Sequence, residues 1–111
     1  MTFEAEQAMT FIRDEFRDRA LFRSGVMCLR PDDALEMVRA CRSQRVEVLG
    51  VDGYHLGRDT IQPDLSESID VSSLPASSLE DCWVRAEAFL RERQSSALFF
   101  AVVTDEPRNA D

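Results

Sequence analysis

Acidic side chains gather in one segment of this sequence, and they are the first residues to consider for chemistry. The chain of 111 residues has 21 acidic and 13 basic side chains and a net charge of −8. Residues 59–81 contain no Arg or Lys and carry the carboxylates of Asp59, Asp64, Glu67, Asp70, Glu80 and Asp81. The negative potential of such a segment steers cationic partners. It predicts either a merely solvated acidic segment, which is common, or a binding site for a basic protein.

Tyr54 and the single histidine, His55, lie just before the acidic segment. A histidine beside a carboxylate can act as an acid–base pair. On a strand, however, Tyr54 and His55 point to opposite faces, and Asp52 precedes a presumed turn, which disfavours a catalytic pair. Both residues are therefore assigned to the partner-binding surface. An enzyme that uses His55 is the least favoured function.

Other reactive groups lack the patterns that their chemistry requires. The sequence has no Gly-x-Ser-x-Gly elbow and no Gly-rich phosphate loop, and its carboxylates lack the spacing of a Ca²⁺ loop. Its three cysteines, Cys28, Cys41 and Cys82, form no CxxC pair and lie among apolar neighbours, as reduced core thiols do. We therefore expect no catalytic residue, no metal and no cofactor.

Charge and hydropathy limit the partners and the compartment. A net charge of −8 disfavours nucleic acid, because the polyanion would be repelled. The longest apolar run, residues 97–103, is far shorter than the roughly 20 residues of a membrane-spanning helix. The first residues do not resemble a signal peptide, so a cytoplasmic location is expected. The length predicts one domain over residues 1–104, with a flexible tail over 105–111.

Apolar periodicity predicts three amphipathic helices. The first covers residues 3–21 and the second residues 32–43, while a Ser77–Glu80 capping box opens the third. The side chains expected in the core are Ala5, Ala8, Met9, Ile12, Phe16 and Ala20, then Ala34, Leu35, Val38 and Cys41, and finally Leu79, Cys82, Trp83, Ala86, Phe89 and Leu90.

Strands are expected between these helices. Residues 25–29 and 97–103 are apolar, and the second run, which has no polar alternation, predicts a strand covered on both faces. A hairpin follows Val46, with its turn either at Asp52–Gly53 or near residues 57–59. Ser, Pro and acidic residues over 58–78 predict mostly loop, with room for short strands at 60–62 or 69–71.

The order of these elements predicts the fold. After the first helix it reads β-α-β-β-loop-α-β, the pattern of a ferredoxin-like α+β sandwich with a four-stranded sheet and helices on one face. One feature argues against this topology. Its last strand usually lies at the sheet edge, whereas here the last strand is the most apolar of all. Either the first helix covers that edge or the strand order differs.

Several short segments resemble small bacterial immunity-type proteins and uncharacterised bacterial α+β domains. They are Leu49-Gly50-Val51-Asp52-Gly53-Tyr54, Ile61-Gln62-Pro63, Ser68-Ile69-Asp70, and Phe89-Leu90 with Leu98-Phe99-Phe100. This resemblance covers about the C-terminal two thirds and includes no family-defining motif. It implies an acidic cytosolic protein that binds and blocks a toxin, often a basic nuclease. A small-molecule-binding regulatory domain that acts as a dimer is the alternative, and the oligomeric state stays open.

Overall fold

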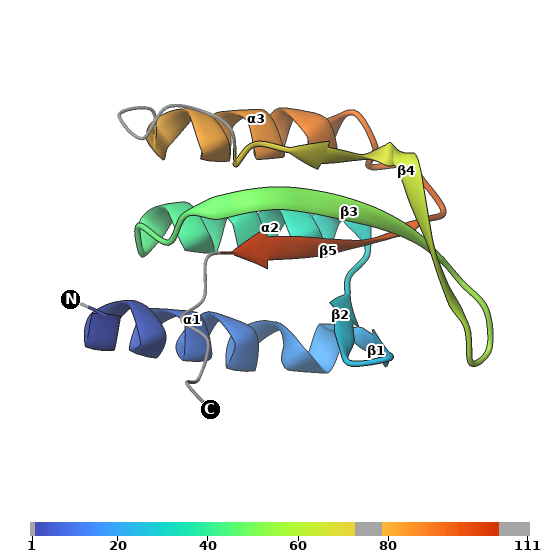
Figure 1. The fold of residues 1–111 in the computed structure, drawn as a ribbon, viewed down its shortest axis with the longest axis horizontal. Coiled ribbons are helices and arrows are strands. Elements are labelled where there is room, and N and C mark those ends of the chain that lie inside the picture. Colours follow the sequence, from blue (N-terminus) through green and yellow to red (C-terminus); the bar gives the residue numbers. More distant parts are fainter. Residues whose placement is uncertain (1, 73–78, 105–111) are drawn as a thin grey trace.

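The protein is a mixed α+β structure in which a small antiparallel sheet packs on two helices (Figure 1). The computed structural model describes residues 2–72 and 79–104, with side chains from Gln7 onward. Strands β3 (Val48–Leu56), β4 (Ile61–Asp70) and β5 (Phe99–Thr104) form the sheet in the order β4-β3-β5. Helices α2 (Pro31–Ser43) and α3 (Leu79–Arg91) cover one face of it.

The N-terminal part lies on the β5 side of this sheet. Helix α1 (Thr2–Phe16) continues into a 3-10 helix, η1 (Arg17–Arg19), and packs against α2. The expected helix therefore ends before residue 21. Residues 21–23 instead form strand β1 (Leu21–Arg23), which pairs with β2 (Val26–Cys28). Positive φ angles of 51° and 78° at the intervening Ser24 and Gly25 make the two-residue turn that favours a hairpin.

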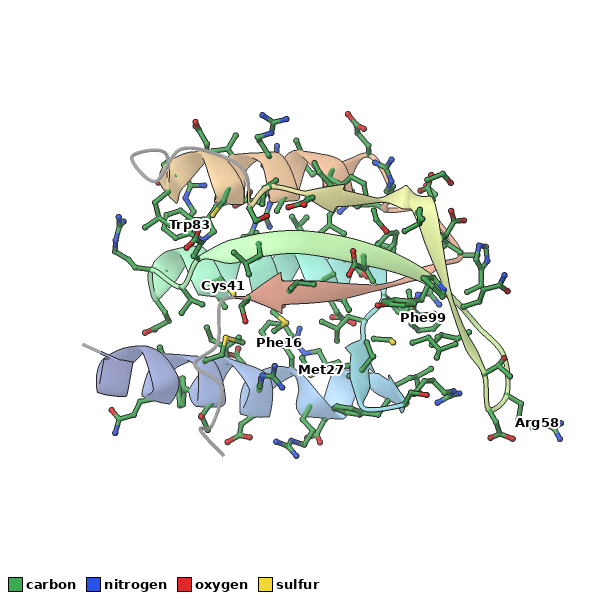
Figure 2. All side chains as sticks on the ribbon, viewed as in Figure 1. Phe16, Met27, Cys41, Arg58, Trp83 and Phe99 are labelled. Carbon is green, nitrogen blue, oxygen red and sulfur yellow. The ribbon has the colours of Figure 1, made fainter. Side chains whose placement is uncertain are left out.

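The core lies between the sheet and the helices and confirms most of the expected apolar stripes (Figure 2). Trp83 is fully buried, and its indole N–H donates to the Val46 carbonyl over 2.9 Å. The Phe89 and Phe100 rings meet edge to face with centroids 6.0 Å apart. All three cysteines are buried and free, as expected. Burial raises the pKa of the Cys41 thiol to about 12, which keeps it protonated and unreactive.

The expectation of mostly loop is wrong for residues 58–72, the described part of 58–78, although the short strands allowed at 60–62 and 69–71 overlap the ends of the observed strand. Ten of them form β4, and the hairpin turn falls at Gly57, whose N–H donates to the Thr60 carbonyl over 3.0 Å. Asp52–Gly53 is therefore inside β3 and is not a turn. Gly53 is required there for another reason, because a Cβ would lie 2.4 Å from the Glu67 carbonyl oxygen of β4. The predicted Ser77 cap and the predicted 105–111 tail fall outside the described residues.

The four-stranded ferredoxin-like sheet is not confirmed. Strand β2 pairs with β1 and reaches the main sheet through one isolated bridge, between Leu29 and Phe100. Strand β5 thus has β3 on one side and Leu29 on the other, which accounts for its apolar sequence. Its coverage is incomplete, because the Val103 side chain is 37% exposed. None of the helices over the described residues has the length and apolar character needed to cross a membrane.

Candidate functional site

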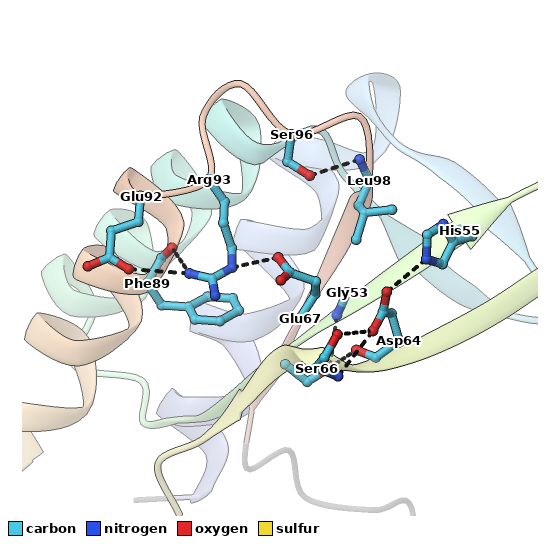
Figure 3. Close-up of polar contacts among 11 residues, drawn as sticks. Gly53, His55, Asp64, Ser66, Glu67, Phe89, Glu92, Arg93, Ser96 and Leu98 are labelled. Carbon is cyan, nitrogen blue, oxygen red and sulfur yellow. Dashed lines mark hydrogen bonds and ion pairs between the residues drawn. The ribbon is translucent and has the colours of Figure 1, made fainter.

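The β4 strand carries a bulge that a local polar network holds in place (Figure 3). Val51 pairs with Ile69 and Gly53 with Asp64, so residues 65–68 have no opposite partners on β3. The Gly53 N–H donates to the Ser68 hydroxyl over 3.1 Å, and this hydroxyl donates to the Asp64 carbonyl over 3.0 Å. The bulge leaves Leu65, at 86%, the most exposed large apolar side chain described.

His55 and Asp64, both predicted as site residues, meet across the hairpin. His55 Nε2 lies 2.8 Å from Asp64 Oδ2, while the Ser66 hydroxyl donates to Asp64 Oδ1 over 2.6 Å. The Ser66 hydroxyl, and after it His55, lowers the pKa of the Asp64 carboxyl. The hydroxyl contacts the carboxylate rather than the imidazole, so these residues do not form a nucleophile–base–acid relay. Their arrangement orders an exposed surface.

Two predicted site residues are neutralised by Arg. Arg93 Nε lies 2.8 Å from Glu67 Oε1, and its guanidinium also stacks 3.8 Å from the centre of the Phe89 ring. Glu80, on α3, is paired with Arg42 of α2. Asp81 follows it as an exposed side chain on α3, outside the hairpin strands. The acidic segment of the sequence therefore does not form one surface.

The face of the sheet opposite α2 and α3 brings together Asp52, Tyr54 and Asp70. Val51 is buried toward the helices, so Asp52 faces the other way. Asp52 and Asp70 line one cleft of about 280 Å³ beside Gly50 and Val103. Burial, and then the charge of Asp70, raises the pKa of the Asp52 carboxyl, whereas the Ser72 hydroxyl lowers that of Asp70.

Tyr54 and His55 lie on opposite sides of β3, as the sequence predicted. Tyr54 borders a second cleft between β2 and β5, and His55 contacts Asp64. Burial, and then the charge of Asp52, raises the pKa of the Tyr54 hydroxyl. Sequence reasoning missed Asp52 as a site residue because it placed a turn there. The available signal was its position two residues before Tyr54, because residues at this spacing share one face of a strand.

Four carboxylates of the hairpin are not balanced by Arg. Across residues 2–72 and 79–104, no Arg side chain forms an ion pair of 4.0 Å or less with Asp52, Asp59, Asp64 or Asp70, and Asp64 has only His55. Asp59 is exposed in the hairpin turn. We call these four residues the hairpin carboxylates. They belong to one hairpin, with Asp52 and Asp70 on the face that carries Tyr54 and Asp64 on the side that carries His55.

The part of the chain that the structure describes contains no group of three or more His, Cys, Asp or Glu side chains placed to hold a metal ion. No protein-family model matches the sequence, and no curated protein matches it. Function is therefore argued from the geometry of the hairpin.

Proposed function

We propose that this chain is a non-enzymatic protein-binding module that docks a basic partner on its β3–β4 hairpin. The observation that carries the proposal is the unbalanced charge of the hairpin carboxylates in a chain that has 13 Arg residues. Negative charge that no internal Arg neutralises acts on molecules outside the protein. It accelerates the association of a positively charged partner and disfavours anionic ones.

The local electrostatics support a cationic contact beside Asp52. Its carboxylate is partly desolvated and lies near a second carboxylate, Asp70, and both effects make its charge unfavourable. A Lys or Arg side chain placed in the cleft between them would relieve this cost. The half-buried ring of Tyr54 lies nearby and supplies apolar contact area.

The resemblance to immunity-type proteins favours one specific form of this function. In that form, the hairpin covers the basic surface of a toxin in the cytoplasm and blocks its access to substrate. His55 and Asp64 then contribute an ordered polar surface rather than catalysis. The competing function is the regulatory domain that binds a small molecule as a dimer. A monomer in light scattering, with no thermal shift across a panel of metabolites, would count against that alternative.

The test compares two quadruple variants that remove the same charge from different surfaces. A partner is first isolated by affinity capture from the organism that carries the chain. Its association rate is then measured over a range of salt concentrations. The hairpin variant carries Asp52→Asn, Asp59→Asn, Asp64→Asn and Asp70→Asn. The control variant removes carboxylates that already contact Arg, through Asp14→Asn, Asp33→Asn, Glu36→Gln and Glu92→Gln.

The hairpin variant should associate about tenfold more slowly and with a weaker dependence on salt. The control variant should change the rate much less, because its carboxylates are already neutralised by neighbouring Arg side chains. Equal effects of the two variants would mean that only net charge matters, and this result would contradict the proposal. Capture of partners that carry no basic surface would contradict it as well.

A further inference from the structure

A cleft opens between β2 and β5, next to the isolated bridge between Leu29 and Phe100. Its volume is about 280 Å³, and Val26 and Met27 form one wall. Val102 and Val103 form the opposite wall, and the buried Met37 of α2 also borders it. We call this cleft the β2–β5 slot. Figure 2 shows Met27 beside β2.

Backbone geometry directs hydrogen-bonding groups into this slot. Leu29 and Phe100 exchange both backbone bonds, of 2.8 and 2.7 Å, so their N–H and C=O groups face each other. In an antiparallel ladder the next pair to exchange bonds is two residues away on each strand, which here is Met27 with Val102. That pair does not form, because the Leu29–Phe100 bridge is isolated.

The Met27 and Val102 groups therefore face each other across the slot without bonding. Backbone directions alternate along a strand, so the N–H and C=O of Val102 point the same way as those of Phe100. The N–H and C=O of Met27 point the same way as those of Leu29, away from Phe22, which is the partner of Met27 on β1. In the described part of the chain, no strand pairing and no isolated bridge joins Met27 to Val102 across this gap. Two donors and two acceptors thus line the slot, which Arg13, Tyr54 and Thr104 also border.

We propose that the β2–β5 slot accepts an extended peptide segment of a partner protein, which adds as a strand to the edge of β5. Only an extended peptide presents alternating N–H and C=O groups on both of its edges, matching Val102 on one side and Met27 on the other. The lining of Val26, Met37 and Val103 suits a β-branched or other small apolar side chain on the inserted residue. The slot adjoins the cleft of Asp52 and Asp70, with which it shares Val103, but its backbone groups do not depend on the role of the hairpin carboxylates.

The experiment titrates the ¹⁵N-labelled full chain with the peptide acetyl-Thr-Val-Thr-Val-Thr-amide. The amide signals of Met27 and Val102 should shift, and hydrogen exchange at the Val102 amide should slow about tenfold. The matched probe is the same peptide with its valine nitrogens methylated, which keeps the side chains but removes the backbone donors. It should produce neither effect.

A protein variant provides a second control. Val103→Trp places a large ring over the slot at a partly exposed position, and it should abolish the shifts. Leu65→Trp makes a comparable change on exposed β4 and should leave them intact. Equal binding of the methylated peptide, shifts away from Met27 and Val102, or no shift at millimolar peptide would each overturn the proposal. The same signals moving on dilution of the protein alone would assign the slot to a second copy and overturn it too.

Discussion

The helical layer and the β3–β4 hairpin differ in how far their carboxylates are paired with Arg. Between α2 and α3, the Glu87 side chain is only 8% exposed and lies 3.6, 3.4 and 3.5 Å from Arg39, Arg42 and Arg91. The hairpin carboxylates have no Arg within this range among the described residues. Charge in the helical layer therefore holds two helices together, whereas charge on the hairpin faces outward. The difference separates structural acids from acids available to a partner.

The largest effect is expected where the hairpin depends on close backbone contact rather than on charge. Gly53→Ala adds a Cβ that would lie 2.4 Å from the Glu67 carbonyl oxygen, so the strands must separate. The free energy of unfolding should fall by about 2 to 3 kcal/mol, measured by urea denaturation. Ser66→Ala on the same bulge is the control and should cost much less, because it removes one exposed hydroxyl and its hydrogen bond to Asp64 without a steric clash. A Gly53→Ala protein as stable as the parent would show that β4 does not cross β3 this closely.

A smaller loss is expected when the charge between the helices is removed. Glu87→Ala leaves Arg39 and Arg42 without their shared carboxylate, and it should lower the free energy of unfolding by about 1 to 2 kcal/mol. The three Arg side chains are about half exposed, which keeps the loss below that of a fully buried pair. Asp59→Asn is the matched hairpin change and should have almost no effect. Equal losses from the two variants would remove the distinction between the regions.

The smallest expected effect is on the pH dependence of stability. It should have opposite signs for Asp52 and Asp70, which line the same cleft. Because the pKa of Asp52 is raised on folding, its ionisation disfavours the folded state, and stability falls as the pH rises through that pKa. Asp52→Asn should therefore raise the thermal midpoint slightly at pH 7 and leave it unchanged at pH 3.

Asp70 should behave in the opposite way. Its pKa is lowered on folding, so its charged form stabilises the fold, and this contribution is lost as the pH falls through the lowered pKa. Asp70→Asn should reduce the midpoint at pH 7. Thermal unfolding of both variants between pH 3 and pH 7 measures the two signs, and a common sign would contradict the geometry of this cleft.

The helices were predictable because their signal is local. Apolar residues at three- and four-residue spacing located the buried faces of α1, α2 and α3, with Ile12, Val38 and Trp83 all buried as expected. Glu87 lies one helical turn before Arg91, a spacing that allows an ion pair on an exposed helix face. That ion pair does form, at 3.5 Å, but two Arg side chains of α2 also cover the carboxylate.

Strand β4 was missed for a different reason. Its Ser, Pro and acidic residues have low intrinsic strand preference, and Pro63 lacks the N–H of a ladder donor. At the sheet edge this loss is tolerated, and Pro63 lies opposite Tyr54 without breaking the pairing. Pairing with the apolar β3 strand thus outweighed local composition, which sequence patterns do not record.

The sequence by itself determined the helical stripes, the burial of the three thiols and the segment in which negative charge accumulates, because each depends on residues close together in the chain. Only the tertiary structure decided which carboxylates remain unbalanced. Glu67 and Glu80 lie in the same acidic segment as Asp64 and Asp70, yet Arg93 and Arg42 neutralise only the first two. These Arg residues lie 26 and 38 positions away, and packing alone brings them into contact.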